Sequence, residues 1–227
     1  MALKSTNKYN RSGNADFFTV EAYKLARTNI ALSIFKQGCK KIVFTSAVPG
    51  EGKTTTSCNI AAAFSKHLDT KTVIIDCDLR KPTVSKFFNL KNTPGLTNYL
   101  SGMCSLEEIV QTVPNTNLSV ICSGIIPPNP SELLSSNEFE NFLDVLSEMF
   151  DYIILDTPPI NVVADALPVA ERADGVVVVA FEERSNYVEI DKAIERLTRC
   201  DAKLLGFILN GSRKKEKSSN RIKNYKQ

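Results

Sequence analysis

A glycine-rich loop with a lysine and a threonine follows a short apolar run at residues 42–44. Residues 47–56 read Ala-Val-Pro-Gly-Glu-Gly-Lys-Thr-Thr-Thr, which matches the phosphate-loop pattern G-x-x-x-x-G-K-[ST] except that Ala47 replaces the first glycine. In such loops backbone N–H groups surround phosphate oxygens, the lysine reaches the β- and γ-phosphates, and the hydroxyl binds Mg²⁺. We therefore expect a nucleotide-binding loop here. Its expected contacts are Pro49, Gly50, Glu51, Gly52, Lys53, Thr54 and Thr55.

Two carboxylates and an arginine end the next apolar run. Residues 73–80 read Val-Ile-Ile-Asp-Cys-Asp-Leu-Arg. In one interpretation Asp76 and Asp78 surround Mg²⁺ and the attacking nucleophile, and Arg80 holds negative charge. In the other, these side chains only cap the chain or pair with Lys81. We favour the first, because a strand that ends here should face the phosphate loop.

A third aspartate, Asp156, follows the apolar run at residues 152–155 and precedes Thr-Pro-Pro. It occupies the position of a carboxylate that holds Mg²⁺ directly or through water. The three motifs together suit phosphoryl transfer, where catalysis consists of positioning and charge neutralisation. Spacing alone does not distinguish water from a hydroxyl group as the acceptor. The expected catalytic residues are Lys53, Asp76, Asp78 and Arg80, and the expected metal ligands are Thr54, Asp76, Asp78 and Asp156.

The elements that must position these groups alternate between short apolar strands and helices. Strands are expected at residues 42–46, 72–76, 118–122, 152–155, 175–181 and 204–209. Helices are expected at residues 16–35, 53–68, 131–149 and 186–200, with helical pieces within 95–112 and a proline-rich loop at 124–130. The alternation predicts a single α/β domain of the P-loop NTPase type, a mostly parallel sheet with helices on both faces. Because ligands bind at the carboxyl ends of such strands, the three motifs should share one site.

Two of these helices carry more detailed signals. Apolar residues recur at three- and four-residue intervals in the first helix, which predicts a buried face. That face would consist of Phe18, Ala22, Leu25, Ala26, Ile30 and Ile34. We expect Ser131 or Ser135 to cap the helix that leads to Met149.

The chain divides into an N-terminal segment (1–40) with an oligomerisation helix, a P-loop domain (41–212) and a tail (213–227). The tail holds seven Lys and Arg residues against one Glu, and we expect it to be disordered. It suits contact with anionic lipid headgroups or an acidic partner, or it only keeps the protein soluble. One short basic tail without a folded basic face argues against a nucleic-acid partner.

The composition is that of an ordinary globular protein, with 43% hydrophobic and 23% charged residues among 227. The longest apolar runs are strand-sized, and the polar start lacks the apolar stretch of a leader peptide, so we expect a cytoplasmic protein. Six cysteines without Cys-x-x-Cys spacing and a single histidine favour reduced thiols over a zinc site.

The three motifs together resemble those of the bacterial tyrosine kinases of capsule and exopolysaccharide systems, over residues 18–212. That family has a phosphate loop, an apolar run ending in D-x-D-x-R and an apolar strand ending in D-[TS]-P-P, here residues 47–54, 73–80 and 153–159. The resemblance implies an autophosphorylating protein-tyrosine kinase that uses ATP and Mg²⁺ and regulates polysaccharide synthesis or export. It also implies a separate membrane adaptor of the polysaccharide co-polymerase type, which recruits the chain to the inner face of the plasma membrane. A protein-tyrosine phosphatase is a further implied partner.

Two more segments are similar to the family. Glu21, Lys24 and Arg27 match its E-x-x-R-x-x-R helix, which packs subunits into a ring. Lys24 replaces the first arginine, so a bidentate contact is lost there; a solvated amphipathic helix is the plainer interpretation of the same pattern. The resemblance also implies that Asn210, at the end of the last strand, lies beside the adenine base.

The tyrosines depart from the family pattern. Members of the family end in a cluster of tyrosines that neighbouring subunits phosphorylate, whereas this tail contains only Tyr225. Tyr225 is therefore either the sole phosphoacceptor, or other proteins are the main substrates. Tyr187 is an acceptor only if it is exposed, and we expect it to be packed.

Two other functions remain open. A partitioning or division-site ATPase switch would use the same fold, but such proteins carry an extra lysine early in the phosphate loop, where this chain has Val48. A scaffold that binds ATP without catalysis is compatible with Ala47 and the sparse tyrosines.

Overall fold

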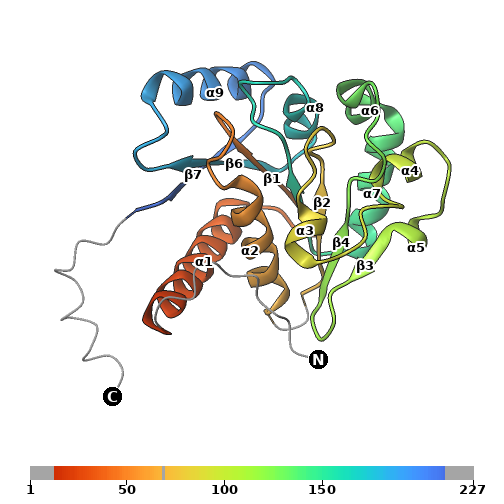
Figure 1. Ribbon diagram of the computed structural model, residues 1–227, viewed down its shortest axis with the longest axis horizontal. Coiled ribbons are helices and arrows are strands. Elements are labelled where there is room, and N and C mark those ends of the chain that lie inside the picture. Colours follow the sequence, from red (N-terminus) through yellow and green to blue (C-terminus); the bar gives the residue numbers. More distant parts are fainter. Residues whose placement is uncertain (1–12, 68–69, 213–227) are drawn as a thin grey trace.

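The computed structural model describes residues 13–67 and 70–212. Within these residues, seven strands form one sheet in the order β3-β4-β2-β5-β1-β6-β7 (Figure 1). Every neighbouring pair is parallel except β3 and β4. The strands are β1 (Lys40–Ser46), β2 (Thr72–Asp76), β3 (Val110–Thr112), β4 (Leu118–Ile121), β5 (Tyr152–Asp156), β6 (Gly175–Phe181) and β7 (Leu204–Asn210).

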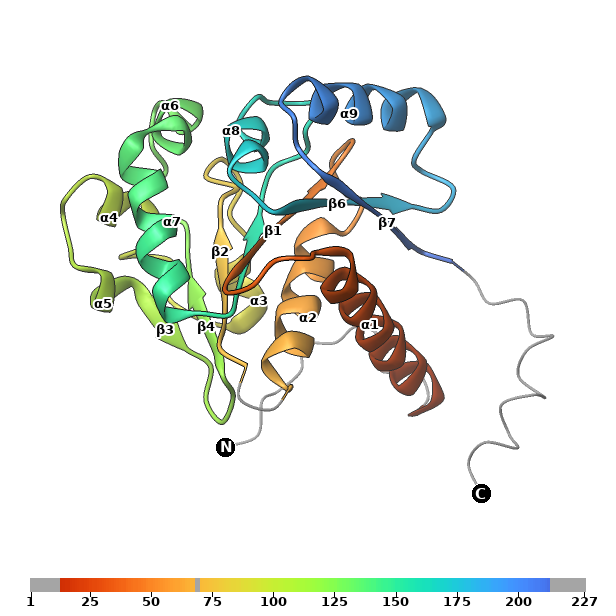
Figure 2. The ribbon, with the colours of Figure 1, turned by 180° about the vertical axis from the view of Figure 1, so that it is seen from behind.

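Helices cover both faces of this sheet (Figures 1 and 2). They are α1 (Gly13–Ser33), α2 (Lys53–Ser65), α3 (Val84–Phe88), α4 (Leu96–Leu100), α5 (Leu106–Ile109), α6 (Pro130–Ser135), α7 (Asn137–Met149), α8 (Ala166–Glu171) and α9 (Tyr187–Arg199). The prediction of a mostly parallel α/β sheet of the P-loop type is confirmed.

The strands are apolar on both sides because both sides are covered. In β1, Ile42 and Phe44 pack in one core with α1, α2 and α3. Val43 points to the opposite face and packs in a second core with α7, α8 and α9. The same alternation runs through β2, β5 and β6, so the central strands are fixed from both sides and their carboxyl ends form a rigid edge.

Several local expectations were wrong. Residues 110–112, placed among helical pieces, form the antiparallel edge strand β3. The segment expected as one helix over 131–149 is two, because Ser136 adopts an extended conformation and caps α7 by accepting a hydrogen bond from the Phe139 amide. Neither Ser131 nor Ser135 is the cap.

The buried face of α1 is shorter than its apolar pattern. Ile30 and Ile34 are buried, but Ala22 is exposed and Leu25 is 62% exposed. The C-terminal part of the segment packs on the core next to α2, while Leu25 turns away from it. No helix in the described residues is long and apolar enough to cross a membrane. The expected disorder of the tail, and Tyr225 with it, lies outside the described residues.

Candidate active site

The phosphate loop connects the carboxyl end of β1 to the start of α2. Gly50 and Gly52 have φ angles of 82° and 86°, a left-handed conformation that glycine adopts without strain. Gly52 occupies the N-cap position of α2, and no side chain caps the helix there. The first N–H groups of α2 are therefore available to an anion, as phosphate binding requires. Pro49 and Thr55 are exposed beside this loop.

Lys53 joins the loop to both acidic motifs. Its Nζ lies 3.0 Å from Oδ2 of Asp78 and 3.8 Å from Oδ2 of Asp156, and its side chain is only 12% exposed. Burial alone would lower the pKa of Lys53, but Asp156 and Asp78 raise it above its ordinary value. Lys53 is therefore a buried cation between two carboxylates, at the point where the phosphate loop meets α2.

Asp156 is fully buried and accepts hydrogen bonds from the first turns of α2. The Thr54 hydroxyl donates to it at 2.6 Å and the Ser57 hydroxyl at 3.1 Å. Burial raises the pKa of Asp156, while Lys53 and the two hydroxyl groups oppose that rise. Because Thr54 and Asp156 are the residue types that hold Mg²⁺ in such loops, their contact places both predicted ligands together.

Asp76 lies beside Asp156, because the two residues are paired in register across β2 and β5. Its Oδ2 accepts hydrogen bonds from the amides of Thr83 and Val84, each at 3.0 Å, and its Oδ1 accepts one from the Asp78 amide at 3.2 Å. Burial raises the pKa of Asp76 to about 8, and the Asp156 carboxylate adds to the rise. Asp76 therefore both fixes the turn after β2 and can hold a proton near neutral pH.

Replacing Asp76 with asparagine should stabilise the nucleotide-free protein at high pH. Between its ordinary pKa near 4 and about 8, folded Asp76 retains a proton that the unfolded chain has released, so stability falls as pH rises through this window. Asparagine has no proton to release in this range, so Asp76→Asn removes the pH-dependent loss of stability. Its amide oxygen can still accept the hydrogen bonds from the Thr83 and Val84 amides. Over about three pH units this loss of stability amounts to roughly 4 kcal/mol, so the melting temperature of Asp76→Asn relative to the parent should rise by about 8–16 °C between pH 5 and pH 8.5.

Thermal melts in EDTA across that pH range test this expectation. Asp191→Asn, on the exposed surface of α9, is the matched control. Its melting temperature should follow that of the parent across the pH range. A difference between Asp76→Asn and the parent that stays constant with pH would contradict a raised pKa at Asp76.

Asp78 combines the two interpretations of the second motif. One carboxylate oxygen accepts a hydrogen bond from the Lys81 backbone amide at 3.0 Å, a local structural contact within the turn after β2. The other oxygen pairs with Lys53, so the residue also belongs to the site. Arg80 does not point at this cluster: it forms two hydrogen bonds, at 2.7 and 3.1 Å, to the buried carboxylate of Asp165.

Glu51 and Asn210 brace the loop through protein contacts. The Glu51 carboxylate is 1% exposed and accepts hydrogen bonds from the Val48 amide and the Ser185 hydroxyl. Asn210 Nδ2 donates to the Glu51 carbonyl oxygen at 2.9 Å and to the Thr56 hydroxyl at 3.0 Å. The end of β7 is thus tied to the start of α2, next to where a nucleotide would sit.

Gly52→Ala should disrupt this contact and weaken ATP binding. A Cβ at Gly52 would lie 2.6 Å from Asn210 Nδ2, and the φ of 86° strains any other residue. We expect ATP affinity to fall at least about tenfold, measured by calorimetry. Gly38→Ala is a matched control, because its φ is 76° but a Cβ there meets nothing within 4 Å. An equal loss of ATP affinity in both variants would show that backbone strain alone is responsible.

The donor set is compatible with Mg²⁺ bound together with a nucleotide. Within the part of the chain that the structure describes, no three His, Cys, Asp or Glu side chains form a group that could hold a metal by themselves. Mg²⁺ in P-loop sites instead takes one or two protein oxygens, waters and phosphate oxygens. The Thr54 hydroxyl and the Asp156 carboxylate provide those protein oxygens.

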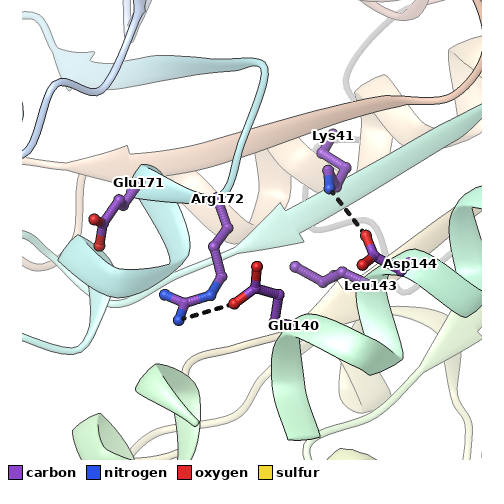
Figure 3. A pocket seen from close by; sticks show the side chains of 6 residues that line it. All are labelled: Lys41, Glu140, Leu143, Asp144, Glu171 and Arg172. Carbon is purple, nitrogen blue, oxygen red and sulfur yellow. Dashed lines mark ion pairs between the residues drawn. The ribbon is translucent and has the colours of Figure 1, made fainter. Parts of the chain in front are cut away.

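A charged hollow of about 320 Å³ lies elsewhere, at the amino end of β1 (Figure 3). Both of its basic side chains are paired with acidic ones: Lys41 with Asp144 and Arg172 with Glu140. The phosphate loop follows the carboxyl end of β1, so this hollow is separate from the nucleotide site.

Comparison with known proteins identifies the family. The family model described as an AAA domain matches residues 39–199. Tyrosine-protein kinase YwqD of Bacillus subtilis (strain 168) is 44% identical over 193 residues, which cover 85% of this chain and 81% of that protein. Tyrosine-protein kinase CpsD of Streptococcus agalactiae is 41% identical over 195 residues, 85% of this chain and 83% of that protein. The chain belongs to the bacterial tyrosine-protein kinases.

Solved structures agree with this assignment. The kinase domain of Escherichia coli tyrosine kinase ETK superposes with a TM-score of 0.82 at 32% identity, covering 86% of this kinase and 76% of that chain. The chimerical protein CapA2B2 gives a TM-score of 0.81 at 38% identity over 86% and 85% of the two chains. The McdA–ATP complex of Cyanothece, at 23% identity and a TM-score of 0.66 over 84% of this chain and 79% of that one, shares the fold alone.

Ser57, which donates to Asp156, was not anticipated in the site of this kinase, and neither were three side chains from later segments. Asp165 binds Arg80, Ser185 binds Glu51, and Arg184 approaches the Gly50 carbonyl oxygen at 3.4 Å. They lie in the segments after β5 and β6, where no phosphate-binding pattern marks them. Knowing that β5 and β6 flank β1 in the sheet would have pointed to these segments, because their carboxyl ends meet the phosphate loop.

The residues predicted for oligomerisation lie along α1. Lys24 pairs with Glu21 at 2.7 Å, and Arg27 donates to the Thr28 hydroxyl at 3.3 Å. Glu21 and Lys24 are exposed.

Proposed function

We propose that this kinase transfers the γ-phosphate of ATP to protein tyrosines, including its own, and thereby regulates capsular or exopolysaccharide synthesis or export. The observation that carries the proposal is the position of Lys53. It lies between Asp78 and Asp156 at the start of α2, so one cation connects the phosphate loop with both acidic motifs.

In the proposed reaction the loop amides and the N-terminus of α2 bind the phosphates. Lys53 exchanges its carboxylate partners for phosphate oxygens and stabilises the charge of the transferred group. Thr54 and Asp156 would hold Mg²⁺, which would supply charge neutralisation on the phosphates. In its ionised form Asp76 accepts the proton of the tyrosine hydroxyl. Asp78 keeps Lys53 in place before ATP binds.

The roles of two other residues in this site are also proposals. Asn210 lies at the edge of the loop through its bonds to Glu51 and Thr56, and we assign it to the adenine side of the site. Arg80 holds negative charge, at present that of Asp165, on the same edge of the sheet.

The partners follow from the family resemblance. We infer a separate membrane adaptor of the polysaccharide co-polymerase type, which activates the kinase at the inner face of the plasma membrane. A protein-tyrosine phosphatase would reverse the reaction. Glu21, Lys24 and Arg27 would support a homo-oligomeric ring, and Tyr225 is the proposed acceptor in the tail.

Release of ADP in the presence of a tyrosine-containing polymer tests the function. The full chain, ATP, Mg²⁺ and the cytoplasmic segment of the adaptor are incubated with a Glu–Tyr copolymer or with the matched Glu–Phe copolymer. A kinase should phosphorylate the tyrosine polymer and release more ADP with it. Equal ADP release with both polymers, without phosphotyrosine, would instead establish the partitioning-type ATPase switch.

A further inference from the structure

The tyrosines of this chain differ in how accessible their side chains are to solvent. Tyr152 stacks on Phe64 at 4.0 Å between ring centroids, and Tyr99 packs against Phe142 at 5.2 Å. Tyr23 is partly buried, and burial raises its pKa. Tyr187 is 87% exposed, so the expectation that it is packed was wrong. Among residues 13–67 and 70–212 it is the single exposed tyrosine.

The chain around Tyr187 is ordered by specific contacts. Tyr187 is the first residue of α9, and the preceding Asn186 caps this helix by accepting a hydrogen bond from the Glu189 amide at 2.9 Å. Ser185 hydrogen-bonds both the Phe181 amide, at 2.7 Å, and the Glu51 carboxylate. The acceptor hydroxyl is therefore presented to solvent by a segment anchored on the phosphate loop.

We propose that Tyr187 is a phosphoacceptor that a second copy of this kinase phosphorylates. The inference rests on the proposed kinase activity and names a substrate of the same site. In the transfer Tyr187 Oη bonds to the γ-phosphorus, the bond from that phosphorus to the β–γ bridging oxygen breaks, and ADP leaves. The phenolic proton passes to a carboxylate of the donor's site, where Asp76 is the candidate, and then to solvent.

A second copy can be the donor because the ring of Tyr187 is 87% exposed. Ser185 holds the preceding segment through the Phe181 amide and the Glu51 carboxylate. A neighbouring copy can therefore receive the exposed ring while these contacts stay in place. The experiment with inactive acceptors distinguishes this transfer from one within the same chain.

The surroundings of Tyr187 contain groups that favour a phosphate dianion. The N-terminus of α9, a helix of 13 residues, carries partial positive charge. Arg184 is exposed, stacks over Phe181 and makes only a long contact to Gly50, so its guanidinium is available to pair with phosphate. The carboxylates of Glu183 and Glu189 would repel the phosphate. The N-terminus of α9 and the guanidinium of Arg184 are therefore the main local groups that would stabilise it.

The test uses full-length acceptors that cannot phosphorylate themselves. Lys53→Met/Tyr225→Phe and Lys53→Met/Tyr225→Phe/Tyr187→Phe are uniformly ¹⁵N-labelled, so that their peptides differ in mass from those of the donor. Each is mixed with active, unlabelled full-length kinase, ATP, Mg²⁺, the adaptor segment and the Glu–Tyr copolymer. Trypsin cleaves after Arg184 and Lys192, so mass spectrometry of the peptide 185–192 reports on Tyr187 alone. The acceptor should carry phosphate on this peptide, and the signal should vanish with Tyr187→Phe. The donor should phosphorylate the copolymer equally in both mixtures.

Two controls address folding and specificity. Tyr187→Phe should melt within about 1 °C of its parent, because the side chain is 87% exposed. Tyr99→Phe, in place of Tyr187→Phe, should leave the phosphate on peptide 185–192 unchanged.

The outcomes separate this inference from the proposed function. A phosphorylated copolymer with unmodified Tyr187 would overturn the inference and leave the kinase activity standing. Phosphate on Tyr187 of the active donor but never on the Lys53→Met acceptor would contradict transfer between copies. Absence of phosphotyrosine from every component would overturn the proposed function, and this inference with it.

Discussion

Lys53→Met should reduce phosphotyrosine formation by about 10³-fold or more. The side chain is 12% exposed, and its cation lies within 3.8 Å of both Asp78 and Asp156. Methionine has a similar length but no charge, so it can neither stabilise the transferred phosphate nor neutralise the neighbouring carboxylates. The rate is measured by phosphotyrosine formation at saturating ATP, and binding is measured separately by calorimetry.

Lys66→Met is the matched control for this loss. Lys66 is exposed just beyond the end of α2, so its replacement changes the same charge on the same helix without touching the site. Its rate should stay within about twofold of the parent. In Lys53→Met the carboxylates of Asp78 and Asp156 lose their positively charged partner. A thermal melt therefore checks that the variant is folded. Full activity in a folded Lys53→Met protein would contradict the assigned role.

Asp156→Asn should slow phosphotyrosine formation by about 10²-fold and raise the Mg²⁺ concentration needed for half-maximal rate by about tenfold. The carboxylate accepts hydrogen bonds from Thr54 and Ser57 and is fully buried. An amide has one accepting oxygen, so one of the two hydroxyl groups would face an N–H donor and have to rotate. The variant also loses the negative charge that attracts Mg²⁺ and holds Lys53.

The matched control for Asp156→Asn is Asp144→Asn, whose side chain is 70% exposed and lies away from the phosphate loop. It should show the parental Mg²⁺ dependence. A reduced rate in Asp156→Asn without any change in Mg²⁺ dependence would argue that Asp156 acts only by positioning Lys53 and Thr54.

The sequence predicted the centre of the site because its geometry follows from the fold. Gly52 and Lys53 follow β1, Asp76 and Asp156 are the last residues of β2 and β5, and parallel strands place their carboxyl ends together. The register of β2 against β5 then sets Asp76 beside Asp156. The residue types and their order along the chain were sufficient for this part.

Contacts between loops could not be predicted in the same way. The bond of Asp165 to Arg80, and that of Ser185 to Glu51, join residues 85 and 134 positions apart in segments without a recognisable pattern. Exposure was equally hard to foresee: Leu25 fits an apolar stripe yet is 62% exposed. These contacts and exposures depend on where neighbouring helices and strands end in the folded chain. The local spacing of apolar residues does not contain that information.

This kinase is expected to pass phosphate from ATP to tyrosine and not to water. Phosphoamino-acid analysis of the full chain, after incubation with Mg²⁺, γ-labelled ATP and the adaptor's cytoplasmic segment, tests this transfer directly. Label on phosphotyrosine that disappears with Lys53→Met is the predicted result. Label found only as inorganic phosphate, with none on tyrosine, would contradict the claim.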